Sequence, residues 1–365
     1  MLGVAWPSMR VSLDAPLAGL GALVSAMTVA QFAASGVSGL LRERLGTIAL
    51  LLTAAIVGAA GLVFFAVASG WWATIVAALL LGGGLGLLDA AVNTEAALRG
   101  DLRFMGALHG AWAIGASLGP PLVGAMFAVT ESWRPAYALA AAAFALLAVV
   151  IWITRRDLEA APEIPADTPG DRPVGRTVVL GCALMFVYVG IELGAGQWSY
   201  TRLVVDGSLT DALAGGAVFL YWSALAGGRV ALALFGDRVA PSRLFDLSVF
   251  GALASTVAFA ALPASIAAAV ALPCLGLALS VFVPVLLYLT PRRIGAAASP
   301  RAIGYQVAAG MIGGAALPAA VGVVMQTVDV AALGPCLVAM AAALAALHVA
   351  SSRTAEARTY VGASS

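Results

Sequence analysis

The sequence predicts an all-α membrane protein made of two similar helical halves, and three observations predict it. Apolar residues make up 62% of the 365 residues and charged residues only 10%, against roughly half and a quarter in a soluble protein. The apolar residues fall into stretches long enough to cross a bilayer as helices. One polar segment near the middle divides these stretches into two groups, and short motifs recur in both groups.

Eleven apolar stretches have about the 20 residues that a helix needs to cross the hydrocarbon core. Five precede the polar segment and six follow it, and a short apolar piece, MLGVAWP, precedes them all. Glycine and proline mark several of the joints. The predicted spans are residues 17–38, 46–68, 71–97, 104–129, 133–153, 177–200, 211–234, 243–262, 264–290, 300–325 and 330–351.

The segment 154–176 differs in kind from the rest of the chain. Its sequence, TRRDLEAAPEIPADTPGDRPVGR, is rich in Pro, Asp, Glu and Arg and holds no apolar run, which is typical of a solvated linker. We therefore expect an N-terminal helix bundle over 1–153, a C-terminal bundle over 177–352 and a tail over 353–365.

Arginine positions predict the orientation of the chain. With the predicted spans, 16 of the 19 basic residues, Arg229 among them, fall on one side of the membrane, and only Arg10, Arg134 and Arg202 fall on the other. Cytoplasmic loops accumulate positive charge. The linker and the C-terminus are therefore expected in the cytoplasm, and the chain is expected to be a multi-pass protein of the cytoplasmic (inner) membrane.

Two carboxylates lie inside predicted spans, one in each half. Asp89 lies in LLLGGGLGLLDAAVNTEAAL and Glu192 in VVLGCALMFVYVGIELGAGQW. An ionised side chain in hydrocarbon costs several kcal/mol, so such residues usually face a cavity and serve a function. Since a carboxylate can bind and release a proton, we expect both residues to couple protons to transport. The alternative for each is a structural hydrogen bond to a neighbouring helix.

Polar residues near these carboxylates and in one other span are candidate substrate ligands. Asn93 lies four residues after Asp89, on the same face of a helix. Gln197 and Trp198 follow Glu192, and Tyr305 and Gln306 lie early in a later span. The alternatives are that these side chains join helices and that Trp198 is an interfacial anchor.

Short motifs repeat between the halves. GASLGPPLVG at 115–124 matches GGAALPAAVG at 313–322, and the loop GLLRERLG at 39–46 has a weaker copy in Gly236-Asp237-Arg238. These residues and the central linker resemble the major facilitator superfamily, whose loop after the second helix reads G-x-x-x-D-R-x-G-R/K. Here Glu43 stands for the Asp of that pattern, and Thr47 stands for the first basic residue after the last glycine. The resemblance implies two six-helix halves that alternate access to a central cavity.

Within the superfamily, three stretches resemble the fucose-permease-like group of sugar and proton symporters. They are GLGLLDAAVNT, YVGIELGAGQW and AIGYQVAAGMIGGAALP, in the fourth, seventh and eleventh helices that the family fold would have. This resemblance implies a sugar as substrate and a proton as the coupling ion.

Charged residues at predicted helix ends are candidate gates. Glu43 and Arg44, with Asp237 and Arg238 in the second copy, are expected to contact neighbouring helix ends on the cytoplasmic side. His109 opens its span in ALHGAWAIG near the cytoplasm. It is expected either to make a helix-end contact or to act in a gate or proton relay.

The expected function is secondary active transport of a small polar solute by alternating access, coupled to protons. The first alternative is a drug or metabolite exporter driven by proton antiport, and the second is a membrane sensor that does not transport. No nucleophile, base and orienter constellation is visible, so an enzyme is not expected. A GxxxxGK[ST] loop is absent from the sequence, which argues against an ATP-driven pump.

Several partners are not expected. The two histidines are far apart and the three cysteines lie singly in apolar spans, so neither a metal site nor another cofactor is predicted. The net charge of +1 gives no reason to expect nucleic acid. The expected partners are the solute, protons and the lipid bilayer, and the protein is expected to be a monomer.

The first helix of the N-terminal half is expected to be truncated. Trp6 corresponds to Trp198 in the repeat, which would place the start of that helix about fifteen residues before Met1. MLGVAWP alone is too short to span a membrane. We therefore expect a remnant of helix 1 followed by helices 2–6, and then helices 7–12, with eleven full spans.

Overall fold

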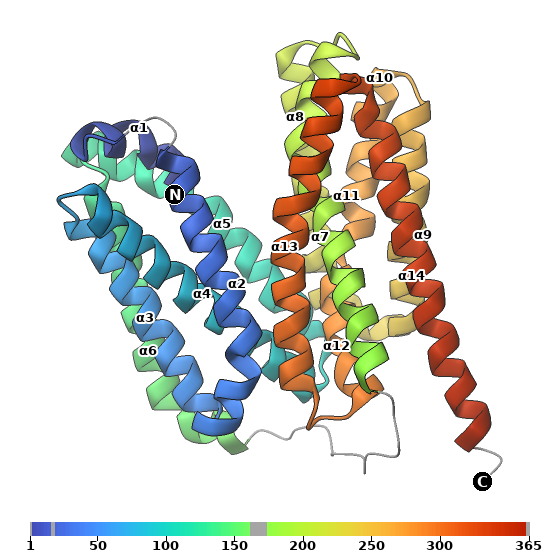
Figure 1. The fold of residues 1–365 in the computed structure, drawn as a ribbon, viewed down its shortest axis with the longest axis horizontal. Coiled ribbons are helices and arrows are strands. Elements are labelled where there is room, and N and C mark those ends of the chain that lie inside the picture. The colour runs from blue at the N-terminus through green and yellow to red at the C-terminus, as the bar shows by residue number, and fades with distance from the viewer. Residues whose placement is uncertain (1, 16–18, 161–173, 363–365) are drawn as a thin grey trace. The chain divides into compact units, whose positions relative to one another are not determined.

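The computed structural model describes residues 2–15, 19–160 and 174–362, and every regular element in these ranges is helical (Figure 1). The predicted all-α class is therefore confirmed. The longer elements are α1 (Leu2–Ser12), α2 (Gly19–Leu45), α3 (Thr47–Val67), α4 (Trp71–Arg99), α5 (Leu102–Thr130), α6 (Arg134–Ala160), α7 (Val174–Val205), α8 (Asp211–Phe235), α9 (Pro241–Ala261), α11 (Leu272–Ser280), α12 (Phe282–Ile294), α13 (Ser299–Thr327) and α14 (Leu333–Gly362).

Short helical turns lie between some of these helices. The 3₁₀ turns η1 (Gly236–Arg238) and η3 (Val330–Ala332) follow α8 and precede α14, and α10 (Ala264–Ile266) leads into the π-helical η2 (Ala267–Ala271). A π-turn is a local widening of an α-helix. α10, η2, α11 and α12 therefore belong to one apolar span that runs from Ala264 to Ile294.

Ten segments of the described chain are long and apolar enough to cross a membrane. They coincide with ten of the eleven predicted spans, and the remaining prediction, 104–129, corresponds to α5, a helix of 29 residues. The eleven predicted spans therefore agree with the helices. α1 has 11 residues, fewer than the ~20 that a spanning helix needs.

The predicted linker is helical at both of its edges. α6 continues to Ala160 and α7 begins at Val174, so 154–160 and 174–176 extend the flanking helices. The rest of the linker lies outside the described residues. In the same way, α14 continues past the predicted start of the tail at 353 and ends at Gly362.

One compact unit contains α1 to α4, α5 from Ala111 onward, α6 and the first part of α13, Ser299–Ala308. In this unit α4 packs between α2 and α3, and α6 packs on α3. Glycine makes the close approach of α2 and α4 possible, since a β-carbon at Gly86 would clash with the backbone of Gln31. Small residues at such crossings allow membrane helices to gain van der Waals contact.

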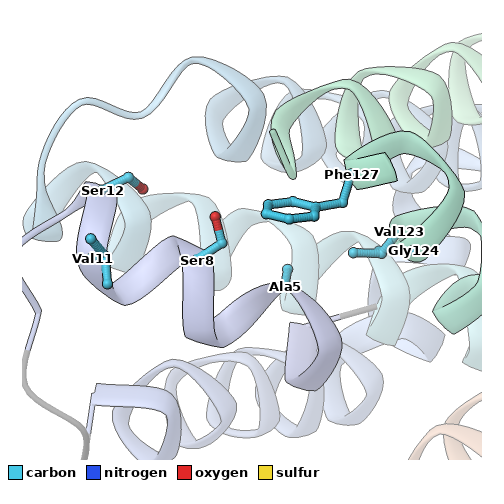
Figure 2. A pocket seen from close by; sticks show the side chains of 7 residues that line it. All are labelled: Ala5, Ser8, Val11, Ser12, Val123, Gly124 and Phe127. Atoms are coloured by element: carbon cyan, nitrogen blue, oxygen red, sulfur yellow. The ribbon is translucent and has the colours of Figure 1, made fainter. Parts of the chain in front are cut away.

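A cavity of about 540 Å³ lies between α1 and α5 in this first unit. Figure 2 shows the ring of Phe127 from α5 directed towards Ala5 and Ser8 of α1. Among the described lining residues the other polar side chain is Ser12, whose hydroxyl donates to the carbonyl of Met9 and accepts from the indole of Trp133. The lining is otherwise apolar, so this cavity holds none of the predicted site residues.

The second compact unit contains the start of α5 up to Gly110, α7 to α12, α13 from Ala309 onward and α14. α8 packs on α11, and α14 packs on both α7 and α9. Buried aromatic rings fill its core, and Tyr188 stacks on Phe282 with ring centres 4.4 Å apart. This packing fixes the positions of α7 and α8, which carry the charged site of the unit.

Candidate functional site

The carboxylate in the first unit is held by an amide. Asn93 donates from Nδ2 to Asp89 Oδ1 at 2.8 Å and to the Asp89 carbonyl at 2.9 Å. The i to i+4 spacing of a helix brings the two side chains together. Asp89 is partly exposed and Asn93 is only 3% exposed. Asn93 Oδ1 is buried without a hydrogen-bond partner among the described residues, so it retains the capacity to accept one.

Helical periodicity places this pair on the side of α4 that faces α2. At 3.6 residues per turn, Gly82, Gly86, Asp89 and Asn93 share one face. A β-carbon at either glycine would clash with the backbone of α2, so this face is the one that packs on α2. The predicted pairing of Asp89 with Asn93 is therefore present in the structure.

The carboxylate in the second unit is held by a guanidinium. Arg229 Nη2 on α8 donates to Glu192 Oε1 on α7 at 3.2 Å. The exposed fractions of the two side chains are 5% for Arg229 and 10% for Glu192. The prediction that counted Arg229 among the cytoplasmic arginines was wrong, because this residue lies inside the α8 span and pairs with Glu192.

Two buried tyrosines fix the backbone around the Glu192–Arg229 pair. Tyr221 on α8 donates its hydroxyl hydrogen to the Glu192 carbonyl at 2.8 Å. Tyr188, one turn before Glu192, donates to the carbonyl of Leu279 on α11 at 3.0 Å. Both tyrosines are fully buried. The Glu192–Arg229 pair therefore lies among α7, α8 and α11, and these hydrogen bonds join the three helices around it.

The two predicted ligands after Glu192 differ in their surroundings. Gln197 is exposed. Trp198 is partly buried, and its indole N–H donates to the carbonyl of Pro318 on α13 at 2.8 Å. The hydrogen-bonding capacity of Trp198 is therefore used within the protein, and its ring contacts α13 at Gly322.

The other two predicted ligands lie in the part of α13 that belongs to the first unit. Tyr305 is exposed at 48%, and Gln306 is buried at 3%. This stretch of α13 packs on α2, where a β-carbon at Gly304 would clash with the carbonyl oxygen of Ser35. The compact unit thus contains Asp89, Asn93 and Gln306, while Glu192 belongs to the other unit.

The predicted gate residues take part in two similar charge contacts. Glu43 at the end of α2 pairs with Arg301 at the start of α13. In the second unit, Asp237 of η1 lies 3.7 Å from Arg103 at the start of α5. Each contact joins the end of one helix, either its last turn or the 3₁₀ turn that follows it, to the first turn of another helix. The sequence repeat is therefore also a repeat of contacts.

The remaining gate candidates make no such pair. Arg44 is exposed, and Arg238 lies over the ring of Phe235 at 4.8 Å. His109 is partly buried on α5, its Nε2 has no hydrogen-bond partner among the described residues, and it lies within electrostatic reach of Arg229. His109 therefore stays a candidate for a relay, whereas no ion pair joins Arg44 to another residue in the described part of the chain.

Sequence reasoning missed Glu95. Its carboxylate accepts from Arg42 Nε at 3.0 Å and from the hydroxyl of Thr47 at 3.0 Å, and Arg42 Nη2 lies 2.9 Å from the same oxygen. These contacts join α4 to the end of α2 and the start of α3. Arg42 and Thr47 lie in the loop motif that was recognised. The sequence contained a signal for this contact. Glu95 lies after Asp89 near the end of the same span, and the loop motif lies at that same end of the neighbouring spans.

Metal binding finds no support in the part of the chain that the structure describes. No group of three or more His, Cys, Asp or Glu side chains is close enough there to hold a metal ion.

Long apolar helices with charged groups held inside them are the features of a multi-pass membrane protein. A model of the Major Facilitator Superfamily matches residues 1–318, so the chain belongs to that superfamily. The predicted family is therefore confirmed, and so is the expectation that the chain is not an enzyme, because the members of this superfamily are transporters.

Solved structures with the same fold include sugar and proton symporters. The chain is similar to FucP in the outward conformation, with a TM-score of 0.77 and 17% identity over 96% of this chain and 94% of that one. The Escherichia coli fucose:proton symporter FucP gives 0.74 and 15% over 96% and 93%. The proton:xylose symporter XylE gives 0.66 and 13% over 94% and 90%. A comparison with curated proteins found no match.

Proposed function

We propose that this chain is a secondary active transporter that carries a small polar solute across the cytoplasmic membrane by alternating access, with protons as the coupling ion. The observation that carries the proposal is the pair of carboxylates, Asp89 and Glu192, each inside a spanning helix with its own polar partner. A buried acid in hydrocarbon is retained at a cost, which a role in coupling explains.

Asp89 is the simpler proton carrier of the two. Its described side-chain partner is the neutral amide of Asn93, and its side chain is partly exposed. It can therefore take up a proton without leaving a cation unpaired. The unused acceptor atom of Asn93 supplies a site for a hydroxyl or amino hydrogen of the solute. FucP and XylE share the fold, and a sugar is the first cargo to test.

The two charge contacts at helix ends supply a mechanism for gating. We place Glu43–Arg301 and Asp237–Arg103 at the cytoplasmic side, where they hold helix ends together in one state of the cycle and separate in the other. Both contacts are exposed to solvent. Exposed ion pairs contribute little free energy, which suits contacts that form and break in every cycle.

Solute flux tests this function. The purified protein is screened for stabilisation by sugars, sugar acids and polyols, because a bound solute raises apparent stability. The protein is then reconstituted in proteoliposomes, and a pH gradient is imposed across their membrane. We expect solute accumulation that a protonophore abolishes. The direction of the proton flux relative to the solute separates symport from antiport, and no flux of any stabilising solute would identify a sensor instead.

Cysteine labelling tests the proposed orientation. Single cysteines are introduced between 161 and 170 after Cys182, Cys274 and Cys336 have been replaced. We expect reaction with impermeant thiol reagents only when the cytoplasmic side is accessible. Labelling of intact cells from outside would contradict a cytoplasmic linker and C-terminus.

A further inference from the structure

We propose that the solute carries an acidic group, a carboxylate or a phosphate, and that Arg229 binds this group in exchange for Glu192. The inference rests on the proposed transport function and narrows its substrate class. Nothing in the sequence patterns assigned a role to Arg229, and the structure places it in contact with one of the two coupling carboxylates.

The contact between the two side chains leaves room for exchange. Arg229 reaches Glu192 through one nitrogen and one oxygen, Nη2 and Oε1, at 3.2 Å. A guanidinium has five N–H donors in a planar fork that fits a carboxylate or a phosphate with two parallel hydrogen bonds. An acidic group of the solute therefore offers Arg229 a second anion of the same chemistry as Glu192.

The ionisable surroundings of the pair come from three helices. Tyr188 lies one turn before Glu192 on α7, Tyr221 lies on α8, and His109 of α5 is within electrostatic reach of Arg229. Tyr188 in turn contacts the carbonyl of Leu279 on α11 and the ring of Phe282 on α12. Glu192 is the carboxylate that the structure pairs with Arg229.

The burial of Arg229 links proton binding to anion binding. Arg229 is 4% exposed, and removal of one charge from a buried pair leaves the other uncompensated at a high cost. Protonation of Glu192 would remove the negative charge that is paired with Arg229, and an anion of the solute can replace that charge. The hydroxyl groups of a neutral sugar carry no charge to replace it, whereas a sugar acid or another carboxylate does.

The resulting step is balanced in charge and atoms. The solute anion forms hydrogen bonds to Arg229, the bond from Arg229 to Glu192 breaks, and Glu192 takes one proton from water on the side from which the solute came. On the opposite side the anion leaves, the proton leaves and the pair forms again. One anion and one proton move together through this site, and the site itself keeps the same net charge.

Thermal stabilisation by matched acids and amides tests the inference without a known substrate. The purified full chain is titrated with acetate and benzoate, and with acetamide and benzamide, above pH 5.5, where the acids are ionised. In Glu192→Gln, Arg229 has lost its internal anion. We expect the acids to bind about tenfold more tightly to this variant than to the wild type, and the amides to give no shift in either protein.

The pH dependence gives a second, independent readout. In the wild type, the apparent affinity for the acids should rise as the pH falls, because Glu192 must take a proton when the anion binds. In Glu192→Gln this dependence should disappear. The double variant Glu192→Gln/Arg229→Gln removes both charges and leaves a polar side chain at each position, and it should show no response to the acids.

If the Glu192–Arg229 pair had only a structural role, we would expect none of these differences between acids and amides or between the variants. The inference is overturned if Glu192→Gln gains no affinity for acids, if amides stabilise as well as acids, or if the double variant responds as the single one does. If Glu192→Gln fails to fold, the pH dependence of acid binding to the wild type still tests the inference. Wild-type affinity for the acids that does not change with pH would contradict the exchange. Failure of proton-driven flux with intact acid binding would refute the transport function, and only the exchange of anions at Arg229 would then stand.

Discussion

Asp89 and Glu192 are both carboxylates inside spanning helices, but their partners differ in charge. Asp89 receives a hydrogen bond from the neutral amide of Asn93, one turn away on the same helix. Glu192 receives one from the cationic Arg229 on another helix. A proton on Asp89 leaves no charge behind, whereas a proton on Glu192 leaves a buried cation. In the proposed mechanism, Asp89 therefore takes up a proton without another ligand, and Glu192 does so when an anion of the solute binds Arg229.

The difference also predicts how each site contributes to stability. A pair of opposite charges in a low-dielectric interior is very sensitive to the loss of one member. A hydrogen bond between polar side chains in a membrane protein contributes only about 0.6 kcal/mol on average. Loss of one charge at the Glu192 site should therefore affect folding more than loss of the hydrogen bonds between Asn93 and Asp89. Three variants test the account in order of expected effect.

Arg229→Gln should have the largest effect. It leaves the Glu192 carboxylate buried without a cation, and we expect a loss of about 3 kcal/mol or more in the free energy of unfolding, measured by titration with a denaturing detergent. The double variant with Glu192→Gln should recover most of that loss, because no charge then remains. A double variant as unstable as the single one would show that the pairing of charges is not the cause.

Asn93→Leu should have a smaller effect. It removes the two hydrogen bonds that Asn93 donates to Asp89, and we expect a loss of about 1 kcal/mol in the same measurement. The same change should strongly reduce solute affinity if Asn93 binds the cargo. A loss as large as that of Arg229→Gln would mean that the two sites are not different in kind.

Tyr221→Phe should have the smallest effect. The substitution deletes only the hydroxyl that donates to the Glu192 carbonyl, and the ring can keep its packing. We expect a loss of about 0.5 kcal/mol and an unchanged preference of the protein for acids over amides. A lost preference for acids would mean that Tyr221 itself contacts the solute.

The helices could be predicted from the sequence because membrane spans are set by local hydropathy. Each span needs about 20 apolar residues whatever its neighbours are, and the predicted spans coincide with the observed helices. The pairing of Asp89 with Asn93 could also be predicted, since both residues lie on one helix at a fixed spacing.

The partners of Glu192 and Arg42 could not be predicted in the same way. Arg229 and Glu95 each lie on a different helix from the residue they contact, and such a contact depends on packing that one sequence does not display. Arg229 was assigned to the cytoplasmic side because it is near the end of its span. Six residues, Val-Ala-Leu-Ala-Leu-Phe, separate it from the helix end, and this was the available signal that it lies inside.

Proton-driven accumulation in proteoliposomes tests the central claim most directly. The solute identified by the stabilisation screen is measured with the wild type, Asp89→Asn, Glu192→Gln and the control Asp329→Asn. Asp329 is an exposed carboxylate that caps η3, and asparagine caps equally well. We expect both intramembrane variants to lose accumulation driven by the pH gradient and the control to keep it. Wild-type accumulation and pH dependence in both intramembrane variants would contradict the account.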